Sequence, residues 1–207
     1  MIGGSLLVVS GPSGSGKSSL CKKLCAIYEP ACLSISTTTR APRGGETDGQ
    51  DYFFVSKEAF TASIDKGEFL EWANVHGNYY GTNKQWVRAA LEIGKSVIFD
   101  IDVQGQAAIS KMFPNETTSV FVTAPNITIL KERLIGRGAD DAAALETRLK
   151  NALEETSRIE RYDYLLINDN FEESLEILKG IAASSRIKSG RVSLRQFISN
   201  WQEQKEL

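Results

Sequence analysis

The strongest restriction on the fold comes from residues 5–19, which read SLLVVSGPSGSGKSS. The apolar run at 6–9 is short and partly β-branched, which is typical of a buried strand. Residues 11–18 then match the spacing G-x-x-x-x-G-K-S, and Leu20, Leu24 and Ile27 follow at helical spacing. The segment therefore predicts a strand, a loop and a helix in succession.

The residue types in this loop suit a polyphosphate. Gly11, Gly14 and Gly16 permit backbone conformations that a side chain would forbid, so that successive N–H groups and the helix N-terminus can point at an anion. Lys17 is placed to reach the β- and γ-phosphates, and the Ser18 hydroxyl is placed to ligate Mg²⁺. The motif predicts a nucleotide-phosphate site and leaves open what happens to the phosphate.

Composition and charge exclude several classes of partner. The chain has 207 residues, 42% of them apolar, and 24 basic against 26 acidic residues give a net charge of −2. This balance gives no electrostatic case for binding nucleic acid or a membrane surface. No stretch approaches the ~20 apolar residues of a membrane span, and the N-terminus lacks the basic region of a signal peptide.

The cysteines favour a reducing compartment. A metal site built on Cys21, Cys25 or Cys32 would lack partners, because His76 is the only histidine and there is no second cysteine cluster. We therefore expect buried, reduced thiols in a cytoplasmic protein.

Strands and helices alternate along the rest of the chain. Strands are predicted at 33–36, 52–55, 69–73, 96–102, 118–122 and 165–167, with a turn at 77–82. Helices are predicted at 56–64, 84–93, 103–112, 126–135, from about 145 to 160, and at 171–187. The alternation predicts a parallel sheet covered by helices on both faces. Ligands of such sheets bind beyond the carboxyl ends of the strands, where the phosphate loop and Asp100 and Asp102 fall.

We expect a single domain over 1–207 with inserted parts. Its core is 1–33, 85–136 and 146–190, residues 34–84 form an inserted lobe of short strands, and the polar, Ala-rich stretch 137–145 is a mobile cover. The C-terminal helix 191–207 has one apolar face, formed by Leu194, Phe197, Ile198 and Trp201. This face either docks on the chain's own surface or forms a dimer contact.

Phosphoryl transfer needs alignment and positive charge more than covalent chemistry. An acceptor that is itself a phosphate is already anionic near neutral pH, so that no general base is needed, and this fits a chain with one histidine. Arginines stand at both places where charge is required. Those beside the cover are Arg133, Arg137 and Arg148, while Arg40 and Arg43 lie in the loop of the inserted lobe, with Tyr52 and Tyr80 near in sequence. Two arginines and two phenols suit a phosphate monoester.

Several separated segments carry a family resemblance. SISTTTRAPRGGETDGQDYFFVS, FLEWANVHGNYYGT and IFDIDVQG stand in order beside GPSGSGKSS, followed by LKERLIGRG, ETRLKNALEE and YDYLLINDN. Over residues 5–185 the chain resembles the guanylate kinases, which are ATP:GMP phosphotransferases. The resemblance implies an α/β fold of the P-loop NTPase type, a parallel sheet flanked by helices with an inserted GMP-binding lobe and a mobile lid. It implies transfer of the γ-phosphoryl group of ATP to GMP, and also to dGMP, in purine nucleotide metabolism with Mg²⁺ as cofactor.

The resemblance also implies roles for individual residues. ATP would be bound by Gly11, Ser13, Gly14, Ser15, Gly16, Lys17, Ser18, Ser19, Arg133, Asn168 and Asp169. GMP would be bound by Ser36, Arg40, Arg43, Tyr52, Glu71, Tyr80, Thr82, Asp100, Asp102 and Gly105. The catalytic set would be Lys17, Arg43, Arg137 and Arg148, and Mg²⁺ would be bound by Ser18, with Asp100 acting through water.

Within the GMP set, Ser36, Glu71 and Thr82 would read the base. A carboxylate at Glu71 can accept from guanine N1–H and the 2-amino group together, and adenine offers no such pair of donors. The chain departs from the family pattern at Asn83, where serine is common, at Gly44, where proline is common, and at APNI in place of APPS.

Three other functions remain open at this stage. Relatives of this fold bind phosphopeptides without catalysis, but their phosphate loop is usually degraded and this one is intact. A kinase for a different phosphate acceptor would differ at Ser36, Glu71 and Thr82. A GTPase switch would leave the inserted lobe unexplained.

Overall fold

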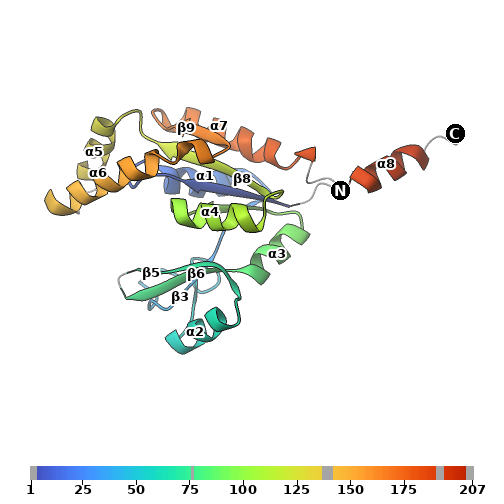
Figure 1. Cartoon of the computed structure of the whole chain (residues 1–207), viewed down its shortest axis with the longest axis horizontal. Coiled ribbons are helices and arrows are strands. Elements are labelled where there is room, and N and C mark those ends of the chain that lie inside the picture. The colour runs from blue at the N-terminus through green and yellow to red at the C-terminus, as the bar shows by residue number, and fades with distance from the viewer. Residues whose placement is uncertain (1–3, 76, 137–141, 190–193, 204–207) are drawn as a thin grey trace.

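The computed structural model describes residues 4–75, 77–136, 142–189 and 194–203, and its centre is a five-stranded parallel sheet (Figure 1). The strand order is β2-β7-β1-β8-β9. The strands are β2 (Ala31–Leu33), β7 (Ser96–Asp100), β1 (Ser5–Ser10), β8 (Thr117–Thr123) and β9 (Tyr164–Ile167). Parallel pairing brings the carboxyl ends of β1, β7 and β8 to one edge of the sheet, as the sequence predicts.

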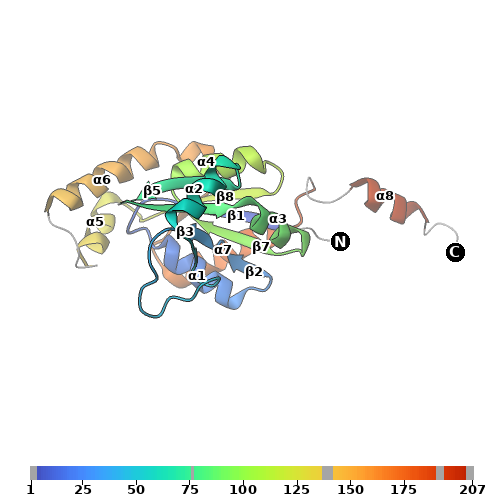
Figure 2. The ribbon, with the colours of Figure 1, turned by 90° about the horizontal axis from the view of Figure 1, so that it is seen from below.

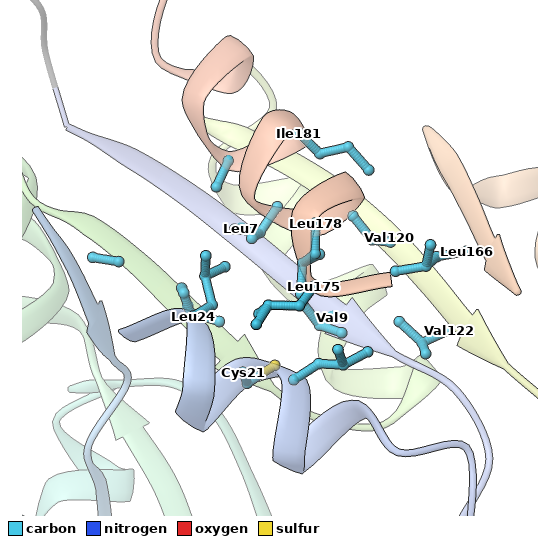
Figure 3. Packing of buried hydrophobic residues seen from close by; sticks show 14 residues of the cluster. Leu7, Val9, Cys21, Leu24, Val120, Val122, Leu166, Leu175, Leu178 and Ile181 are labelled. Atoms are coloured by element: carbon cyan, nitrogen blue, oxygen red, sulfur yellow. The ribbon is translucent and has the colours of Figure 1, made fainter. Parts of the chain in front are cut away.

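The alternation of side chains along β1 explains why helices cover both faces of this sheet. Leu7 and Val9 pack on one face against α1 (Lys17–Ile27) and α7 (Phe171–Ser185) (Figure 3). Leu6 and Val8 pack on the other face against α3 (Lys84–Glu92) and α4 (Val103–Met112). All of these β1 side chains are fully buried, because a parallel central strand has no face that is open to water.

Three further elements extend the fold beside the sheet. Helices α5 (Ile127–Gly136) and α6 (Ala142–Thr156) pack on each other through Leu130, Leu134 and Ala152. The short 3₁₀ helix η1 (Ile159–Arg161) then leads into β9. Helix α6 thus begins within the stretch 137–145 that the sequence predicts as a cover, while residues 137–141 lie outside the described residues.

A second, four-stranded sheet with the order β4-β3-β6-β5 lies below the main sheet in Figure 1. Its elements are β3 (Ser36–Thr38), β4 (Tyr52–Phe54), α2 (Lys57–Asp65), β5 (Phe69–Val75) and β6 (Asn78–Asn83). Its own core is aromatic, because the Phe60 ring stacks between Phe69 and Tyr79 with centroid separations of 4.3 and 5.4 Å.

Two predicted elements are wrong. The strand predicted at 33–36 is two strands, because Leu33 pairs with Ile98 in the main sheet while Ser36 pairs with Tyr52 in the second sheet. The turn predicted at 77–82 is mostly strand β6. Gly81 lies within that strand and next to β5. A Cβ at this position would lie 3.0 Å from the backbone of Glu71, so the lack of a side chain permits the two strands to approach closely.

The C-terminal helix is present as α8 (Leu194–Glu203) and lies apart from the other elements in both views (Figures 1 and 2). Phe197, Ile198 and Trp201 are 57, 49 and 67% exposed. The apolar face therefore does not dock on the described part of its own chain, which was the first of the two alternatives. Within the same described ranges, no helix combines the length and apolarity needed to cross a bilayer.

Candidate functional site

The loop between β1 and α1 adopts backbone conformations that only glycine takes readily. Gly11, Gly14 and Gly16 have φ angles of 139°, 88° and 90°. A Cβ at Gly11 would lie 2.0 Å from the carbonyl oxygen of Val122, and one at Gly16 would lie 2.3 Å from Nδ2 of Asn168. The neighbouring β8 and β9 ends therefore fix the loop, and each of these glycines is needed where it stands.

A hydrogen-bonded chain of residues fixes the outer side of this loop. Asn168, at the end of β9, donates from Nδ2 to the Ser15 carbonyl at 2.8 Å. Arg133 on α5 donates from Nη1 to the Asn168 carbonyl at 2.8 Å. Arg133, Asn168 and Asp169 line one hollow together with Gly14, Gly16 and Ser19. These residues come from distant parts of the sequence, and the fold brings them together beside the phosphate loop.

The next residues of the loop face the second sheet. The Lys17 ammonium donates to the Pro12 carbonyl at 3.4 Å, which holds the side chain back over the loop. Ser18 and Asp100 line a second hollow whose opposite side is formed by Ser36 and Tyr52 of the second sheet. The same hollow thus brings the two residues predicted to hold Mg²⁺ next to predicted GMP-binding residues of the second sheet.

The second sheet contains a carboxylate, that of Glu71, which is hydrogen-bonded to a hydroxyl on the neighbouring strand. Thr82 is buried, and its hydroxyl donates to Oε1 of Glu71 at 2.7 Å across the β5–β6 pairing. Burial raises the pKa of Glu71, the Thr82 hydroxyl opposes this by stabilising the anion, and Asp102 raises the pKa further. Asp102 therefore lies near enough to Glu71 to act on it electrostatically.

Asp102 and Asn83 have a clear local role as helix caps. Oδ1 of Asp102 accepts from the backbone N–H groups of Gln104 and Gly105 at 3.0 and 2.8 Å and so begins α4. Oδ1 of Asn83 accepts from Gln85 and Trp86 and begins α3, which explains why an amide is well tolerated at this departure from the family pattern.

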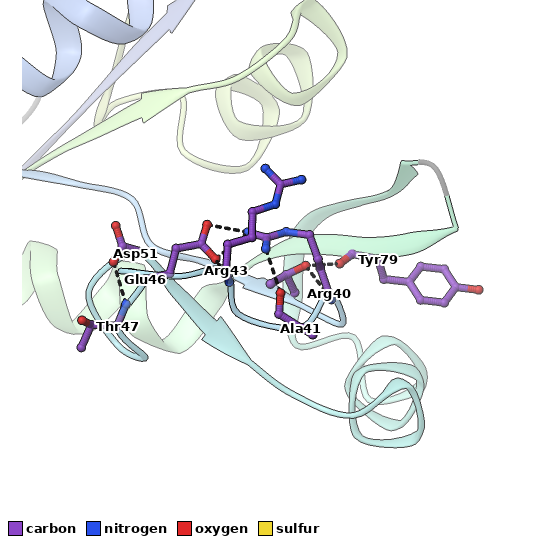
Figure 4. Close-up of polar contacts among 8 residues, drawn as sticks. Arg40, Ala41, Arg43, Glu46, Thr47, Asp51 and Tyr79 are labelled. Atoms are coloured by element: carbon purple, nitrogen blue, oxygen red, sulfur yellow. Dashed lines mark hydrogen bonds and ion pairs between the residues drawn. The ribbon is translucent and has the colours of Figure 1, made fainter.

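Residues 39–51, between β3 and β4, form a loop that contains Arg40 and Arg43 and is called the arginine loop below. Acidic side chains order this loop (Figure 4). Nη2 of Arg40 lies 2.7 and 3.0 Å from the two carboxylate oxygens of Glu46, and the guanidinium lies 5.3 Å from the Tyr52 ring centroid. The backbone N–H of Arg43 donates to Glu46 at 2.7 Å. Tyr80 contacts Tyr52 edge to face, with ring centroids 6.1 Å apart. Arg40, Tyr52 and Tyr80 therefore lie together, and Glu46 joins the backbone of Arg43 to them.

Sequence reasoning missed Glu46 and Glu155. Glu46 is one charge among many in a polar loop, and Glu155 has the spacing of a solvated residue on α6. In the fold Glu155 is half-buried, and burial raises its pKa while Lys17 and Arg158 lower it and Asp102 raises it. The tertiary approach of α6 to the phosphate loop creates this environment, and no local pattern signals it.

Of the two catalytic arginines predicted beside the cover, the structure describes one. Arg148 lies half-buried on α6. Arg137 lies outside the described residues.

The expectation of buried thiols holds in full for one of the three cysteines. Cys21, Cys25 and Cys32 are free, Cys21 is fully buried and the other two are half-buried. Burial raises the pKa of each thiol, that of Cys25 to about 12. The described part of the chain also holds no group of three or more His, Cys, Asp or Glu side chains placed to bind a metal by themselves.

Comparison with known proteins gives a consistent result. The family model described as guanylate kinase matches residues 3–185. A guanylate kinase of Wolinella succinogenes is 47% identical over 198 residues, which are 96% of this chain and 92% of that protein. A guanylate kinase of Helicobacter pylori is 53% identical over 177 residues, covering 86% of this chain and 85% of that protein. The crystal structure of guanylate kinase from Anaplasma phagocytophilum superimposes with a TM-score of 0.75 at 33% identity, covering 97% of this chain and 96% of that one.

Proposed function

The chain belongs to the guanylate kinase family, and on this premise we propose that it transfers the γ-phosphoryl group of ATP to GMP, and also to dGMP, giving ADP and GDP. The observation that carries the proposal is the hollow shared by Ser18 and Asp100 on one side and Ser36 and Tyr52 on the other. A phosphotransferase needs its two substrates to meet at such a place.

On the donor side, ATP lies along the loop between β1 and α1. The backbone N–H groups of residues 13–19 and the start of α1 surround its phosphates, and Lys17 exchanges its long bond with the Pro12 carbonyl for phosphate oxygens. Arg133, Asn168 and Asp169 line the hollow in which the adenosine would lie.

On the acceptor side, the GMP phosphate is bound by Arg40, Arg43, Tyr52 and Tyr80. The base points towards Glu71, whose carboxylate is already oriented by Thr82 and accepts from guanine N1–H and the 2-amino group. Ser36, Asp102 and Gly105 complete this side. Adenine does not offer the two donors that guanine presents, so the half-buried Glu71 carboxylate would keep only its bond from Thr82, and this loss is the source of discrimination.

The residues present fit a Mg²⁺ ion. Ser18 offers a hydroxyl and Asp100 an exposed carboxylate on the wall of the same hollow. Mg²⁺ usually keeps several waters and takes few protein ligands beside substrate phosphates, so that this sparse set is sufficient. Ser18 would bind the ion and Asp100 would bind one of its waters. When bound, the ion would neutralise charge on the β- and γ-phosphates.

The protein's part in the transfer is alignment and charge. The acceptor oxygen is anionic near neutral pH, so no general base is required, and Lys17, Arg43, Arg137 and Arg148 stabilise the charge of the transferring group. We propose that residues 34–84 act as the GMP-binding lobe, 137–145 as a lid, and 1–33, 85–136 and 146–190 as the core. Closure of the lobe on the core would exclude water from the γ-phosphate.

We also propose that α8 forms a contact between two copies of the chain in a cytoplasmic homodimer. The exposed Phe197, Ile198 and Trp201 are the basis of this proposal. Sedimentation of the full chain and of Trp201→Glu tests it: we expect a dimer that becomes a monomer in the variant, and identical masses would contradict the proposal.

Release of ADP, measured with ATP, Mg²⁺ and a panel of nucleoside monophosphates, tests the proposed function. We expect turnover with GMP and dGMP that exceeds turnover with AMP, CMP and UMP by at least about a hundredfold, because a site built to bond a substrate N–H rejects analogues that lack it. ADP release that is equal with and without GMP would contradict the proposal.

A further inference from the structure

We propose that Glu46 is a positioning residue for the acceptor phosphate, which acts through Arg40 and Arg43 and keeps its bonds to both when the phosphate binds. The inference rests on the proposed function, because it concerns the same acceptor site. Its basis is the set of contacts that one carboxylate makes with both arginines of the loop (Figure 4).

Glu46 connects the two arginines. Its oxygens accept from Nη2 of Arg40 at 2.7 and 3.0 Å, and one of them also accepts from the backbone N–H of Arg43 at 2.7 Å. The Arg40 and Glu46 side chains are only 13 and 21% exposed, so that this pair is better shielded than an ordinary surface ion pair. The hydrogen bond from Arg40 lowers the pKa of Glu46, and the carboxylate therefore stays ionised at neutral pH.

The remainder of the turn cannot hold this geometry by itself. A Cβ at Gly44 or Gly45 would meet nothing within 4 Å, so no part of the described chain packs against these two glycines. The turn is closed by the backbone bond from Glu46 to the Arg43 carbonyl at 3.1 Å and by the side chain of Glu46 returning to Arg43. Without the carboxylate, Arg40 would keep its bond to the Ala41 carbonyl and its contact with the Tyr52 ring but lose the partner of Nη2, and the backbone of Arg43 would lose its link to Arg40. The incoming phosphate would then have to order this part of the loop, at a cost in binding free energy.

The geometry also argues that Glu46 stays in place. Arg40 uses Nη2 for Glu46 and Nη1 for the Ala41 carbonyl, and a guanidinium has five N–H donors, so that donors are left for a second anion. Displacing Glu46 would break its bonds to two residues and open the turn. One carboxylate can thus orient Arg40 while the phosphate binds the remaining donors.

Calorimetric titration with GMP, in the absence of ATP, tests the inference on the full chain. We expect Glu46→Gln, which keeps the shape and removes the charge, to weaken GMP binding by about tenfold or more. Glu46→Asp keeps the charge but is one methylene shorter, and we expect it to recover part of the loss. Affinity for a non-hydrolysable ATP analogue should stay within about twofold in both variants, and the Michaelis constant for GMP should change more than kcat does.

Asp48→Asn is the matched control. Asp48 lies in the same loop and accepts from the Phe54 N–H at 2.9 Å, but it contacts neither arginine, and an asparagine can still accept that bond. We expect its affinity for GMP to stay within about twofold of the wild-type value. A comparable loss in this control would attribute the effect to general loop charge and overturn the inference.

The remaining outcomes are also decisive. Unchanged GMP binding by Glu46→Gln would mean that the charge of Glu46 does not position the arginines, and tighter binding would mean that Glu46 competes with the phosphate. Either result would overturn the inference while leaving the proposed function intact. Equal losses for GMP and the ATP analogue would also overturn it, because they indicate general destabilisation. In a crystal structure with GMP, we expect the Arg40–Glu46 bonds to persist, and a phosphate found in place of the carboxylate would overturn the inference. Failure of the wild-type chain to bind GMP would overturn the proposed function itself.

Discussion

The phosphate loop and the arginine loop both bind anions in our proposal, but they are held in place by different forces. The phosphate loop is crowded by backbone: a Cβ at Gly11 would lie 2.0 Å from the Val122 carbonyl. The arginine loop is open: a Cβ at Gly44 would meet nothing within 4 Å. Its order comes from carboxylates, such as Glu46 bonded to Arg40.

The difference follows from where each loop is attached. The phosphate loop connects β1, a fully buried central strand of a parallel sheet, to α1. Residues at the ends of the neighbouring strands therefore lie in close contact with the loop. The arginine loop joins two three-residue strands of a sheet whose aromatic core lies elsewhere. A loop of the first kind is held by the packing of its backbone, and a loop of the second kind depends on side-chain bonds such as those of Glu46. The comparison makes predictions for each.

Lys17→Ala should have the largest effect. It removes the ammonium that stabilises charge on the transferring phosphoryl group, and we expect kcat to fall by about 10³-fold or more, a loss of roughly 4 kcal/mol of transition-state stabilisation. Single-turnover kinetics with saturating ATP and GMP provide the measurement. The control is Lys23→Ala, which replaces an exposed lysine further along α1 and should retain the wild-type kcat. Equal losses in the two variants would refute a specific role for Lys17.

Alanine at Gly11 or at Gly44 tests the comparison directly. Gly11→Ala combines a positive φ with a clash against the β8 backbone, and we expect it to reduce the free energy of unfolding by about 3 kcal/mol or more. Gly44→Ala meets open space, and we expect a change within about 0.5 kcal/mol. Urea denaturation measures both. A Gly44→Ala variant as unstable as Gly11→Ala would show that the two loops are restrained alike.

Glu71→Gln should separate binding from stability within the second sheet. We expect the Michaelis constant for GMP to rise by about a hundredfold, because the amide NH₂ opposes the guanine donors, with little change in that for ATP. Glu68→Gln, at the start of the same hairpin, should leave both constants within about twofold. Equal losses for ATP and GMP would contradict the role proposed for Glu71.

The pKa of Glu71 gives this variant a second, independent readout. Because burial raises the folded pKa of this carboxyl above its unfolded value, the folded state holds its proton more strongly. The contribution of this group to the free energy of unfolding therefore decreases as pH rises from the unfolded pKa through the folded one, and the cost of holding the charge is complete above the folded pKa. Glu71→Gln should consequently be as stable as the wild-type protein at pH 7, or more stable, and its stability should depend less on pH in the acidic range.

The contrast between the loops also explains what the sequence could predict. The phosphate loop was predictable because its requirements are local: glycines at fixed spacing between an apolar strand and a helix. Helix α4 was predicted with its observed bounds for the same reason, since Asp102 caps it locally. The split between β2 and β3 could not be predicted, because four residues give no periodicity to separate two sheets.

Contacts between distant segments were the second limit. The Asn168 bond to the Ser15 carbonyl joins residues 153 positions apart, and only the family resemblance brought Asn168 to attention. Glu155 near Lys17 had no signal of either kind, because a charged residue on a helix usually faces solvent. Glu46 was overlooked although it lies in a segment that carried the resemblance, since its importance comes from bonds to Arg40 and Arg43 rather than from its residue type.

The smallest expected effect tests whether the two regions lose their structure separately. Ser56 caps α2 by accepting from the Ala59 N–H at 3.1 Å, and its replacement by alanine should destabilise that helix by about 1 kcal/mol. Amide hydrogen exchange in α2 should then accelerate by about fivefold, while the amides of β1 and β7 keep their protection, because the two sheets have separate cores. Ser56→Thr retains a capping hydroxyl and serves as the control. Equal acceleration in α2 and β1 would mean that the second sheet opens only together with the main sheet, and the separate stability of the acceptor region expected from its own core would then be refuted.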